Sequence, residues 1–234
     1  MKADSRKGSL KRHMQALALV VMLWMCPVSV LWKQPAAAEQ SGPTDGGTAP
    51  KVALTFDDGP SAQYTPVLLD GLKERGIRAS FFVIGATIEK DGNEELIRRM
   101  KEEGHLIGNH TYSHIQLTSR NRESFREELV QTNEILEEIT GEKISFVRPP
   151  YGSWDKSFEK ELNMFPVLWN IDPLDWCSHN ADCIASKVVE KAGDGDIILM
   201  HDYYETSVTA ALEVVDILQK RGFQFVTVEE ILFD

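Results

Sequence analysis

The chain has 234 residues, and at roughly 150 residues per domain this length predicts one domain or two small ones and excludes two large domains. A hydrophobic fraction of 42% with 26% charged residues predicts a packed core and excludes disordered and collagen-like classes. Beyond the first 38 residues, 19 basic and 35 acidic side chains give a net charge of −16, which repels phosphate backbones, so no nucleic-acid partner is expected.

The first 38 residues have the pattern of an export signal. Basic residues precede an apolar run of 17 residues from Ala16 to Trp32, and Ala36 to Ala38 follow it. The run is just long enough to span a bilayer, so an uncleaved membrane anchor is the alternative, and contact with a membrane is expected only through this segment. We therefore expect a secreted or cell-envelope protein.

Residues 39–50 are rich in Gly, Pro and Thr and predict a flexible linker, and residues 51–234 predict one catalytic domain. In that domain short β-like runs alternate with helical patterns. Residues at three- and four-residue spacings place one face of each expected helix on a core: Leu68, Leu69 and Leu72; Leu96, Ile97 and Met100; and Leu129, Asn133 and Leu136. Strands are expected at Val52–Phe56, Ala79–Ile84, His105–Gly108, Ile144–Val147, Val167–Ile171, Asp196–Met200 and Phe223–Val228. This alternation predicts a parallel sheet, either closed as a (β/α) barrel of seven or eight strands or open and doubly wound.

The unusual polar residues follow the ends of these strands. The groups are Asp57-Asp58, His110 with His114, Arg148 to Gly152, Asp172 to Trp176, and His201-Asp202. Because the carboxyl ends of parallel strands open on one face of a barrel, we expect these groups to share one site.

Asp58, His110 and His114 form a candidate metal site. The histidines stand at i and i+4, a spacing that places two imidazoles on one side of a helical turn. Two histidines and one carboxylate with open positions hold a catalytic zinc, and the same set holds Fe(II) in non-haem oxygenases. These residues predict a divalent cation without naming the reaction.

Two further pairs predict proton transfer. The adjacent carboxylates of Asp57 and Asp58 both stay ionised if a cation binds one of them and Arg148 binds the other. His201 ends an apolar strand, and a shielded imidazole beside a carboxylate such as that of Asp175 is a good proton donor.

The remaining candidates concern the walls of the site and its surroundings. The turn at Tyr151 offers a backbone N–H to a developing oxyanion. Trp176 either walls an apolar pocket with Leu199 or packs as an ordinary core residue. Cys177 and Cys183 are the thiols left after signal cleavage, and we predict a disulfide between them, with two independent thiols as the alternative.

From about Lys51 onward the chain resembles the polysaccharide deacetylase family, carbohydrate esterase family 4, whose catalytic unit is the NodB homology domain. The resemblance lies in five motifs that occur in the family's order: Thr55 to Pro60, His110 to His114, Arg148 to Gly152, Asp172 to Trp176, and Leu199 to His201. Cys177, directly after the fourth motif, departs from the basic or polar residue expected there.

The resemblance implies a distorted (β/α) barrel and a role for each motif residue. Asp57 would be the general base, and His201 the general acid. Asp58, His110 and His114 would bind Zn²⁺ or another divalent cation such as Co²⁺. The other implied roles are orientation of Asp57 by Arg148, tuning of His201 by Asp175, an oxyanion N–H from Tyr151, and an acetate-methyl pocket formed by Trp176 and Leu199.

The implied reaction is metal-dependent removal of N-acetyl groups from an extracytoplasmic polysaccharide. N-acetylglucosamine units of peptidoglycan or chitooligosaccharide are the expected substrate, because an acidic domain favours a product that gains an ammonium group. The alternatives are an O-acetyl esterase acting on xylan and a catalytically inactive sugar-binding barrel. An oxygenase is disfavoured by the alternation of strands and helices.

Overall fold

The computed structural model describes residues 48–90 and 92–233. The expected export signal over 1–38 and all but the last three residues of the expected linker lie outside them. No helix within the described ranges is both long and apolar enough to cross a bilayer. The elements are β1 (Lys51–Asp57), α1 (Thr65–Glu74), β2 (Ser80–Val83), α2 (Gly85–Ile88), α3 (Asn93–Glu102), β3 (Leu106–Asn109), α4 (Arg122–Thr140), β4 (Phe146–Val147), η1 (Pro150–Gly152), α5 (Ser157–Leu162), β5 (Phe165–Pro166), η2 (Asp175–Cys177), α6 (Ala181–Lys191), β6 (Asp196–His201), α7 (Glu205–Lys220), β7 (Gln224–Val226) and α8 (Val228–Phe233).

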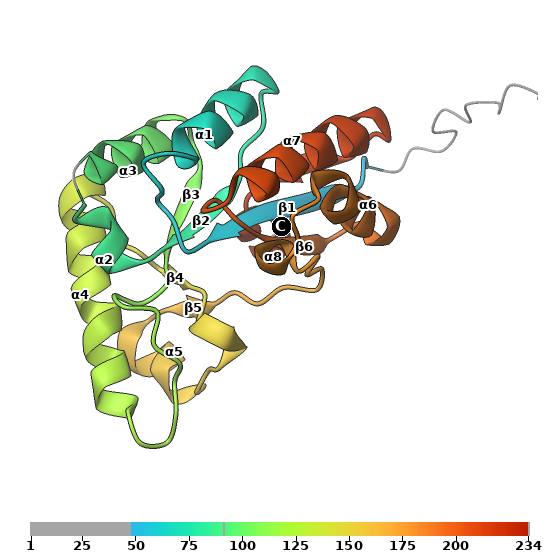
Figure 1. Cartoon of the computed structure of the whole chain (residues 1–234). Coiled ribbons are helices and arrows are strands. Elements are labelled where there is room, and N and C mark those ends of the chain that lie inside the picture. Colours follow the sequence, from blue (N-terminus) through green and yellow to red (C-terminus); the bar gives the residue numbers. More distant parts are fainter. Residues whose placement is uncertain (1–47, 91, 234) are drawn as a thin grey trace, which may run out of the picture. The chain divides into compact units, whose positions relative to one another are not determined.

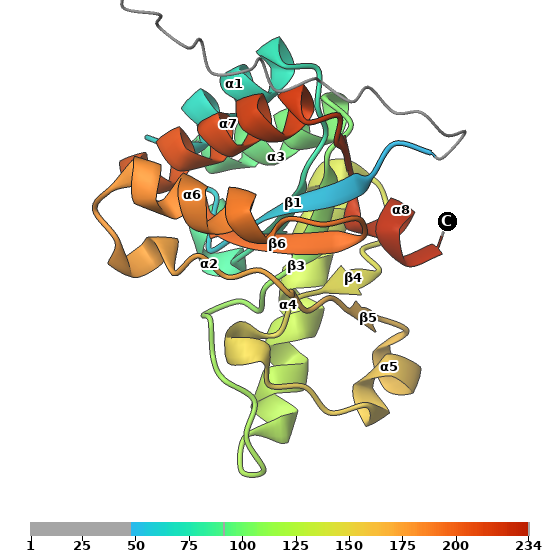
Figure 2. The same cartoon turned by 90° about the vertical axis from the view of Figure 1, so that its right-hand side faces the viewer.

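All strands of the sheet run parallel, in the order β5-β4-β3-β2-β1-β6, and β7 pairs with the first half of β1. The segment after β5 completes the curl, because Ile171 bridges to Ile198 and its carbonyl accepts from the N–H of Leu199 at 2.9 Å. Helices α1, α3 and α7 lie over one side of β1, as Figures 1 and 2 show. This arrangement confirms the distorted (β/α) barrel and excludes the open doubly wound sheet.

The two faces of β1 pack against different apolar clusters. Val52, Leu54 and Phe56 belong to the large cluster between the sheet and the helices, and Ala53 belongs to a small cluster inside the barrel. Because side chains alternate along a strand, the inward positions continue from Ala53 through Thr55 to Asp57. The barrel interior is therefore apolar at its base and polar where β1 ends.

The expected helices form with the expected buried faces. Leu68, Leu69 and Leu72 of α1 are fully buried, as are Ile97 and Met100 of α3. Helix α4 buries Leu129 and Leu136 and ends at Gly141, whose φ of 69° suits glycine at a helix C-terminus.

The fifth strand differs from the prediction. We expected it at Val167–Ile171, but β5 is Phe165–Pro166, and of the expected range only Ile171 forms a bridge. The N–H of Val167 bonds to β4 and the N–H of Asn170 bonds to Ile197 of β6. The segment crosses from one strand to the other, so it forms no continuous ladder with either.

The last strand is also shorter than the expected Phe223–Val228. A Thr-x-x-Glu sequence begins α8 here, because the side chain of Glu230 accepts from the N–H of Thr227 at 2.9 Å. This is half of a capping box, a helix-start signal that was present in the sequence.

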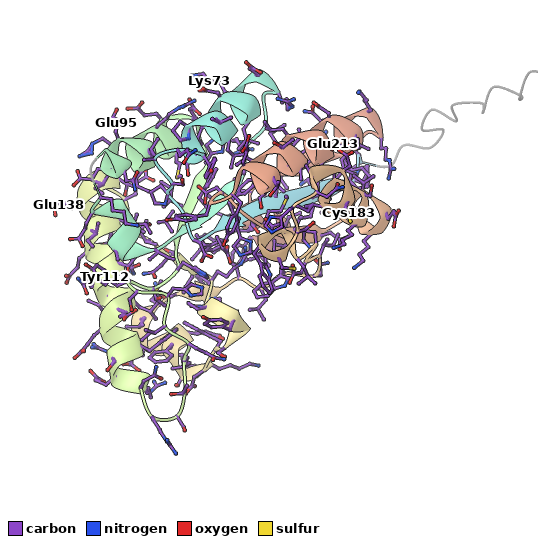
Figure 3. All side chains as sticks on the ribbon, viewed as in Figure 1. Lys73, Glu95, Tyr112, Glu138, Cys183 and Glu213 are labelled. Atoms are coloured by element: carbon purple, nitrogen blue, oxygen red, sulfur yellow. The ribbon has the colours of Figure 1, made fainter. Side chains whose placement is uncertain are left out.

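The predicted disulfide between Cys177 and Cys183 is wrong in this structure, in which both thiols are free and exposed. Cys183 projects from the first turn of α6 (Figure 3), and its N–H is capped by Asn180 Oδ1 at 2.8 Å. Cys177 ends η2, where its Sγ lies 3.2 Å from the carbonyl oxygen of Leu174. Each cysteine thus bonds to a residue three positions before it, and the two sulfur atoms are not joined.

Candidate active site

The turn after β1 separates two adjacent carboxylates. Asp57 is the last residue of β1 and is paired in register with His201, the last residue of β6. Asp58 has a left-handed backbone with φ of 72°, which is unusual for a residue with a side chain. As a result Asp57 lies beside Arg148, whereas Asp58 faces the histidines that follow β3.

The structure brings Asp58, His110 and His114 together. Asp58 Oδ1 lies 3.4 Å from the Nε2 atom of each histidine, and the three donor atoms all lie within 4.8 Å of one another. Ligands bound to zinc at about 2.0–2.1 Å in a tetrahedron are roughly 3.4 Å apart, so the spacing fits this cation.

Two further observations support that fit. Asp58 Oδ1 is buried and has no hydrogen-bond partner within the described residues, as expected for an atom that binds an ion. Burial acts to raise the pKa of Asp58, but the surrounding imidazoles, His110 foremost, lower it below its usual value. The carboxylate is therefore ionised at neutral pH and ready to bind a cation.

The histidines do not lie on a helical turn, which corrects the prediction from their i, i+4 spacing. They belong to a loop in which Thr111 and His114 have left-handed φ values of 65° and 61°. Asn109 holds this loop, since its Oδ1 accepts from the N–H of Thr111 at 2.7 Å. The rings of His110 and His114 still meet, with centroids 5.0 Å apart.

One bond fixes the tautomer of His110. Its Nδ1 lies 2.6 Å from the carbonyl oxygen of Arg148, which can only accept, so Nδ1 carries the proton. Because Nδ1 is used in this bond, Nε2 is the ring atom left to face Asp58 and to bind a metal.

Arg148 is fully buried and holds Asp57, as predicted. Its Nη1 donates to Asp57 Oδ1 at 2.9 Å and to Thr55 Oγ1 at 2.6 Å, and its Nε donates to the carbonyl of Val167 at 3.1 Å. The guanidinium also lies 4.3 Å above the ring of Phe82 inside the barrel. The other oxygen of Asp57, Oδ2, lies 3.8 Å from His110 Nε2.

His201 and Asp175 form the second predicted pair. Asp175 is buried, and it accepts from the N–H of His201 at 2.9 Å and lies 2.8 Å from its Nδ1. Burial alone would lower the pKa of His201, but the hydrogen bond and charge of Asp175 outweigh burial and raise that pKa to about 9. The imidazole is protonated at neutral pH, and its Nε2 lies 3.9 Å from Asp58 Oδ2.

The two adjacent aspartates and the three histidines line one cavity of about 340 Å³, with Arg148 and Asp175 behind its walls. Its apolar walls include the predicted Trp176 and Leu199, of which Trp176 is exposed and Leu199 buried. Tyr151 also lines it, from a turn with φ of 59°, and its ring lies 5.0 Å from that of His114. The full lining is Asp57, Asp58, His110, His114, Pro149, Tyr151, Trp169, Asp172, Trp176, Leu199, His201 and Tyr204.

Sequence reasoning assigned no role to Trp169 and Tyr204 in the lining, nor to Thr55 and Asn109 behind it. All four lie on or just beyond strands whose carboxyl ends meet at the site, which was the available signal. A fifth residue, Asp202, is fully buried, accepts from the hydroxyl of Thr65, and would clash with any Cβ at position 59. Burial raises the pKa of Asp202 to about 7.

A larger cavity of about 450 Å³ lies near the opposite ends of the strands, lined in part by Arg78, Lys101 and His105. Arg78 is paired with Glu230 at 2.8 Å, and Lys101 with Glu142 at 3.1 Å. No group of donors suited to a metal occurs there among the described residues. Within the described part of the chain, the group of donors suited to a metal therefore lies at the carboxyl ends of the strands.

A family model described as polysaccharide deacetylase matches residues 44–167, slightly more than half of the chain. The chain belongs to the polysaccharide deacetylase family. A relative named chitooligosaccharide deacetylase, from Sinorhizobium fredii, is 34% identical over 198 residues, which cover 77% of this chain and 91% of the relative. The resemblance predicted from the five motifs is confirmed.

Two peptidoglycan deacetylases are also similar to this chain. Peptidoglycan-N-acetylglucosamine deacetylase PgdA of Listeria monocytogenes is 36% identical over 184 residues, which are 79% of this chain but only 39% of PgdA. This chain therefore matches about two fifths of the length of PgdA. The solved structure of peptidoglycan deacetylase PdaC from Bacillus subtilis has 38% sequence identity to this chain and a TM-score of 0.73. The match covers 78% of this chain and 90% of the chain in the PdaC structure.

Proposed function

We propose that the protein is a metal-dependent deacetylase that removes N-acetyl groups from an extracytoplasmic polysaccharide. One observation carries this proposal: three donors able to hold a cation lie in the same cavity as the carboxylate of Asp57 and the imidazole of His201, whose pKa is raised. Hydrolysis of an amide needs those three elements, since the carbonyl must be polarised, water must lose a proton and the amine must gain one.

Asp58, His110 and His114 would hold the cation, and zinc suits two imidazoles and a carboxylate. A bound divalent cation would supply Lewis acidity at the acetyl oxygen and at the attacking water. Asp57 would remove the proton from that water: Arg148 binds its Oδ1, so Oδ2, which lies 3.8 Å from His110 Nε2, is the oxygen left to accept the proton in the cavity.

The other residues act on the oxyanion, the leaving amine and the acetyl methyl group. The N–H of Tyr151 stabilises the oxyanion that develops from the acetyl carbonyl. His201 gives its proton to the leaving amine, and Asp175 supplies the charge that keeps His201 protonated. Trp176 and Leu199 enclose the acetyl methyl group.

N-acetylglucosamine units of peptidoglycan are the substrate we favour, with chitooligosaccharide next. Relatives carry both names, and the basic and apolar pattern of residues 1–38 supports export to where cell-wall glycan lies. The charge of −16 beyond that segment favours a product that becomes cationic.

The test measures acetate released by the purified, zinc-loaded protein from peptidoglycan, N-acetylglucosamine oligomers and acetylxylan, with Asp57→Asn as the inactive control. We expect the highest release from an N-acetylated glycan, without any 2-oxo acid added. Greater release from acetylxylan than from every N-acetylated glycan would assign an O-acetyl esterase. Binding of glycan without any acetate release would assign a sugar-binding barrel.

A further inference from the structure

The active-site cavity is small for a polymer. At about 340 Å³ it lies near the lower end of the roughly 300–1,000 Å³ typical of ligand sites. A polysaccharide whose acetyl group enters this cavity must place its neighbouring sugars on the surface around the mouth. The residues at that mouth therefore decide which lengths of glycan bind well.

Three exposed aromatic residues line the cavity and come from three separate elements. Tyr151 of η1 is 66% exposed, Trp176 of η2 is 54% exposed, and Tyr204, just before α7, is 43% exposed. Tyr151 and Trp176 have roles in the proposed reaction. Tyr204 lies outside the five motifs and has none.

The backbone of Tyr204 is fixed on both sides. Its carbonyl accepts from the N–H of Val208 at 3.1 Å in the first turn of α7. Two residues earlier, Asp202 is fully buried and bound to the hydroxyl of Thr65. A ring on such a backbone can accept a ligand without paying the entropy of ordering a loop.

The side chain of Tyr204, in contrast, is free to bind. Its ring meets that of Tyr203 edge-on, with centroids 6.0 Å apart, and within the described residues its hydroxyl has no hydrogen-bond partner. An exposed tyrosine offers an apolar ring face and a polar tip. A pyranose ring is complementary to it, because the sugar has an apolar C–H face and hydroxyl groups at its edge.

We propose that Tyr204 is the binding platform for the sugar next to the one being deacetylated, so that it sets a preference for oligomers over the monosaccharide. This inference rests on the proposed function, since the neighbouring sugar is defined by the acetyl group in the cavity. The occupant is a neutral N-acetylhexosamine ring of the same glycan chain.

The chain offers a matched control. Tyr203 is the same residue type, is also 43% exposed and is adjacent in sequence, but it does not line the cavity. We compare Tyr204→Ala, Tyr204→Phe and Tyr203→Ala in the zinc-loaded protein. The substrates are the N-acetylglucosamine tetramer, the monosaccharide and a small activated acetyl ester that fills only the cavity.

For Tyr204→Ala we expect kcat/KM on the tetramer to fall about tenfold, mainly through KM, equivalent to roughly 1.4 kcal/mol of lost contact. The loss on the tetramer should exceed that on the ester at least fivefold. Tyr204→Phe should recover most of the activity, because it keeps the ring. Tyr203→Ala should stay within twofold of the parent on all three substrates.

Calorimetric binding of the tetramer and the monosaccharide, measured in an Asp57→Asn background, separates this inference from the proposed function. Suppose that Tyr204→Ala weakens binding of the tetramer more than binding of the monosaccharide, although the parent protein releases no acetate. The role of Tyr204 as a binding platform is then supported, and the proposed function is wrong. Equal losses on ester and tetramer, or a parent that binds the tetramer no tighter than the monosaccharide, would overturn the platform.

Discussion

At the scale of single residues, the site depends on two adjacent carboxylates having different partners. Asp57 and Asp58 are adjacent in the chain, yet one bonds a buried guanidinium and the other faces two imidazoles. The left-handed backbone of Asp58 makes this division possible, because it turns the chain sharply between the two side chains.

This division predicts that Asp57→Asn separates catalysis from metal binding. Asparagine keeps the size of the side chain and removes its basicity, so acetate release should fall about 100-fold or more while zinc content stays at one per chain. Metal analysis and acetate assays on the same sample check this. Asp58→Asn is the matched control and should lose the metal; loss of zinc from Asp57→Asn instead would mean that the two roles are exchanged.

The pairing of Asp175 with His201 predicts an alkaline limit of activity. In the proposed reaction His201 must be protonated to give a proton to the leaving amine. Asp175 helps to hold the pKa of His201 at about 9, so kcat/KM should fall as pH rises through that value. Asp175→Asn removes the charge that favours the imidazolium, so the pKa drops and the alkaline limb moves to lower pH.

The measurement is the pH profile of kcat/KM for the zinc-loaded enzyme. Asp172→Asn serves as the control, because Asp172 also lines the cavity but accepts from the N–H of Leu174 rather than from His201. An alkaline limb that stays in place in Asp175→Asn would show that another group sets it.

At the scale of elements, close packing inside the barrel fixes the strands that carry the proposed catalytic groups. A Cβ added to Gly108 of β3 would lie 2.5 Å from the ring of Phe82 and 3.2 Å from the carbonyl oxygen of Phe146. The ring of Phe82 packs against the guanidinium of Arg148, which holds Asp57. A side chain at position 108 would displace Phe82 and, through Arg148, would shift Asp57.

Gly108→Ala is therefore expected to lower the free energy of unfolding by about 1–3 kcal/mol through overpacking. The control is Gly71→Ala in α1, where a Cβ would meet the half-buried, flexible end of Leu212 at 2.5 Å. That contact can relax, and alanine adds up to about 1 kcal/mol of helix propensity, so Gly71→Ala should be nearly neutral. Denaturant unfolding of both variants checks the difference, and equal losses would contradict it.

At the scale of the whole molecule, the cation would join parts that are distant in the sequence. Asp58 follows β1, whereas His110 and His114 follow β3, and the cavity they share is completed by β6. Binding at such a site stabilises the folded barrel, because the unfolded chain cannot assemble the three donors.

Exhaustive chelation should accordingly abolish acetate release and lower the melting temperature, and Zn²⁺ or Co²⁺ should restore both. At a hundredfold excess of free metal over its Kd the gain is about 2.7 kcal/mol. Calorimetry with and without chelator measures it, and Asp58→Asn should show no response to added zinc. Full activity in a sample shown to contain no metal would disprove the cation site.

The sequence alone determined the alternation of strands and helices and the groups that follow the strand ends. Apolar spacing is a local property, so Leu68, Leu69 and Leu72 identified their helix without tertiary information. The partnerships of Asp57 with Arg148 and of His201 with Asp175 were also predictable, because parallel strands bring their carboxyl ends to one face.

Only the tertiary structure decided features that depend on contacts between distant segments. The segment from Val167 to Ile171 crosses between two strands, which no local pattern encodes. The histidines converge through left-handed loop residues and not through a helix. Asn109 holds this loop at Thr111, and its own side chain is held by Leu129 and Asn133 of the distant helix α4. Tyr204 became a candidate for binding only when the curl of the sheet placed it at the cavity, because exposure and proximity are properties of the folded chain.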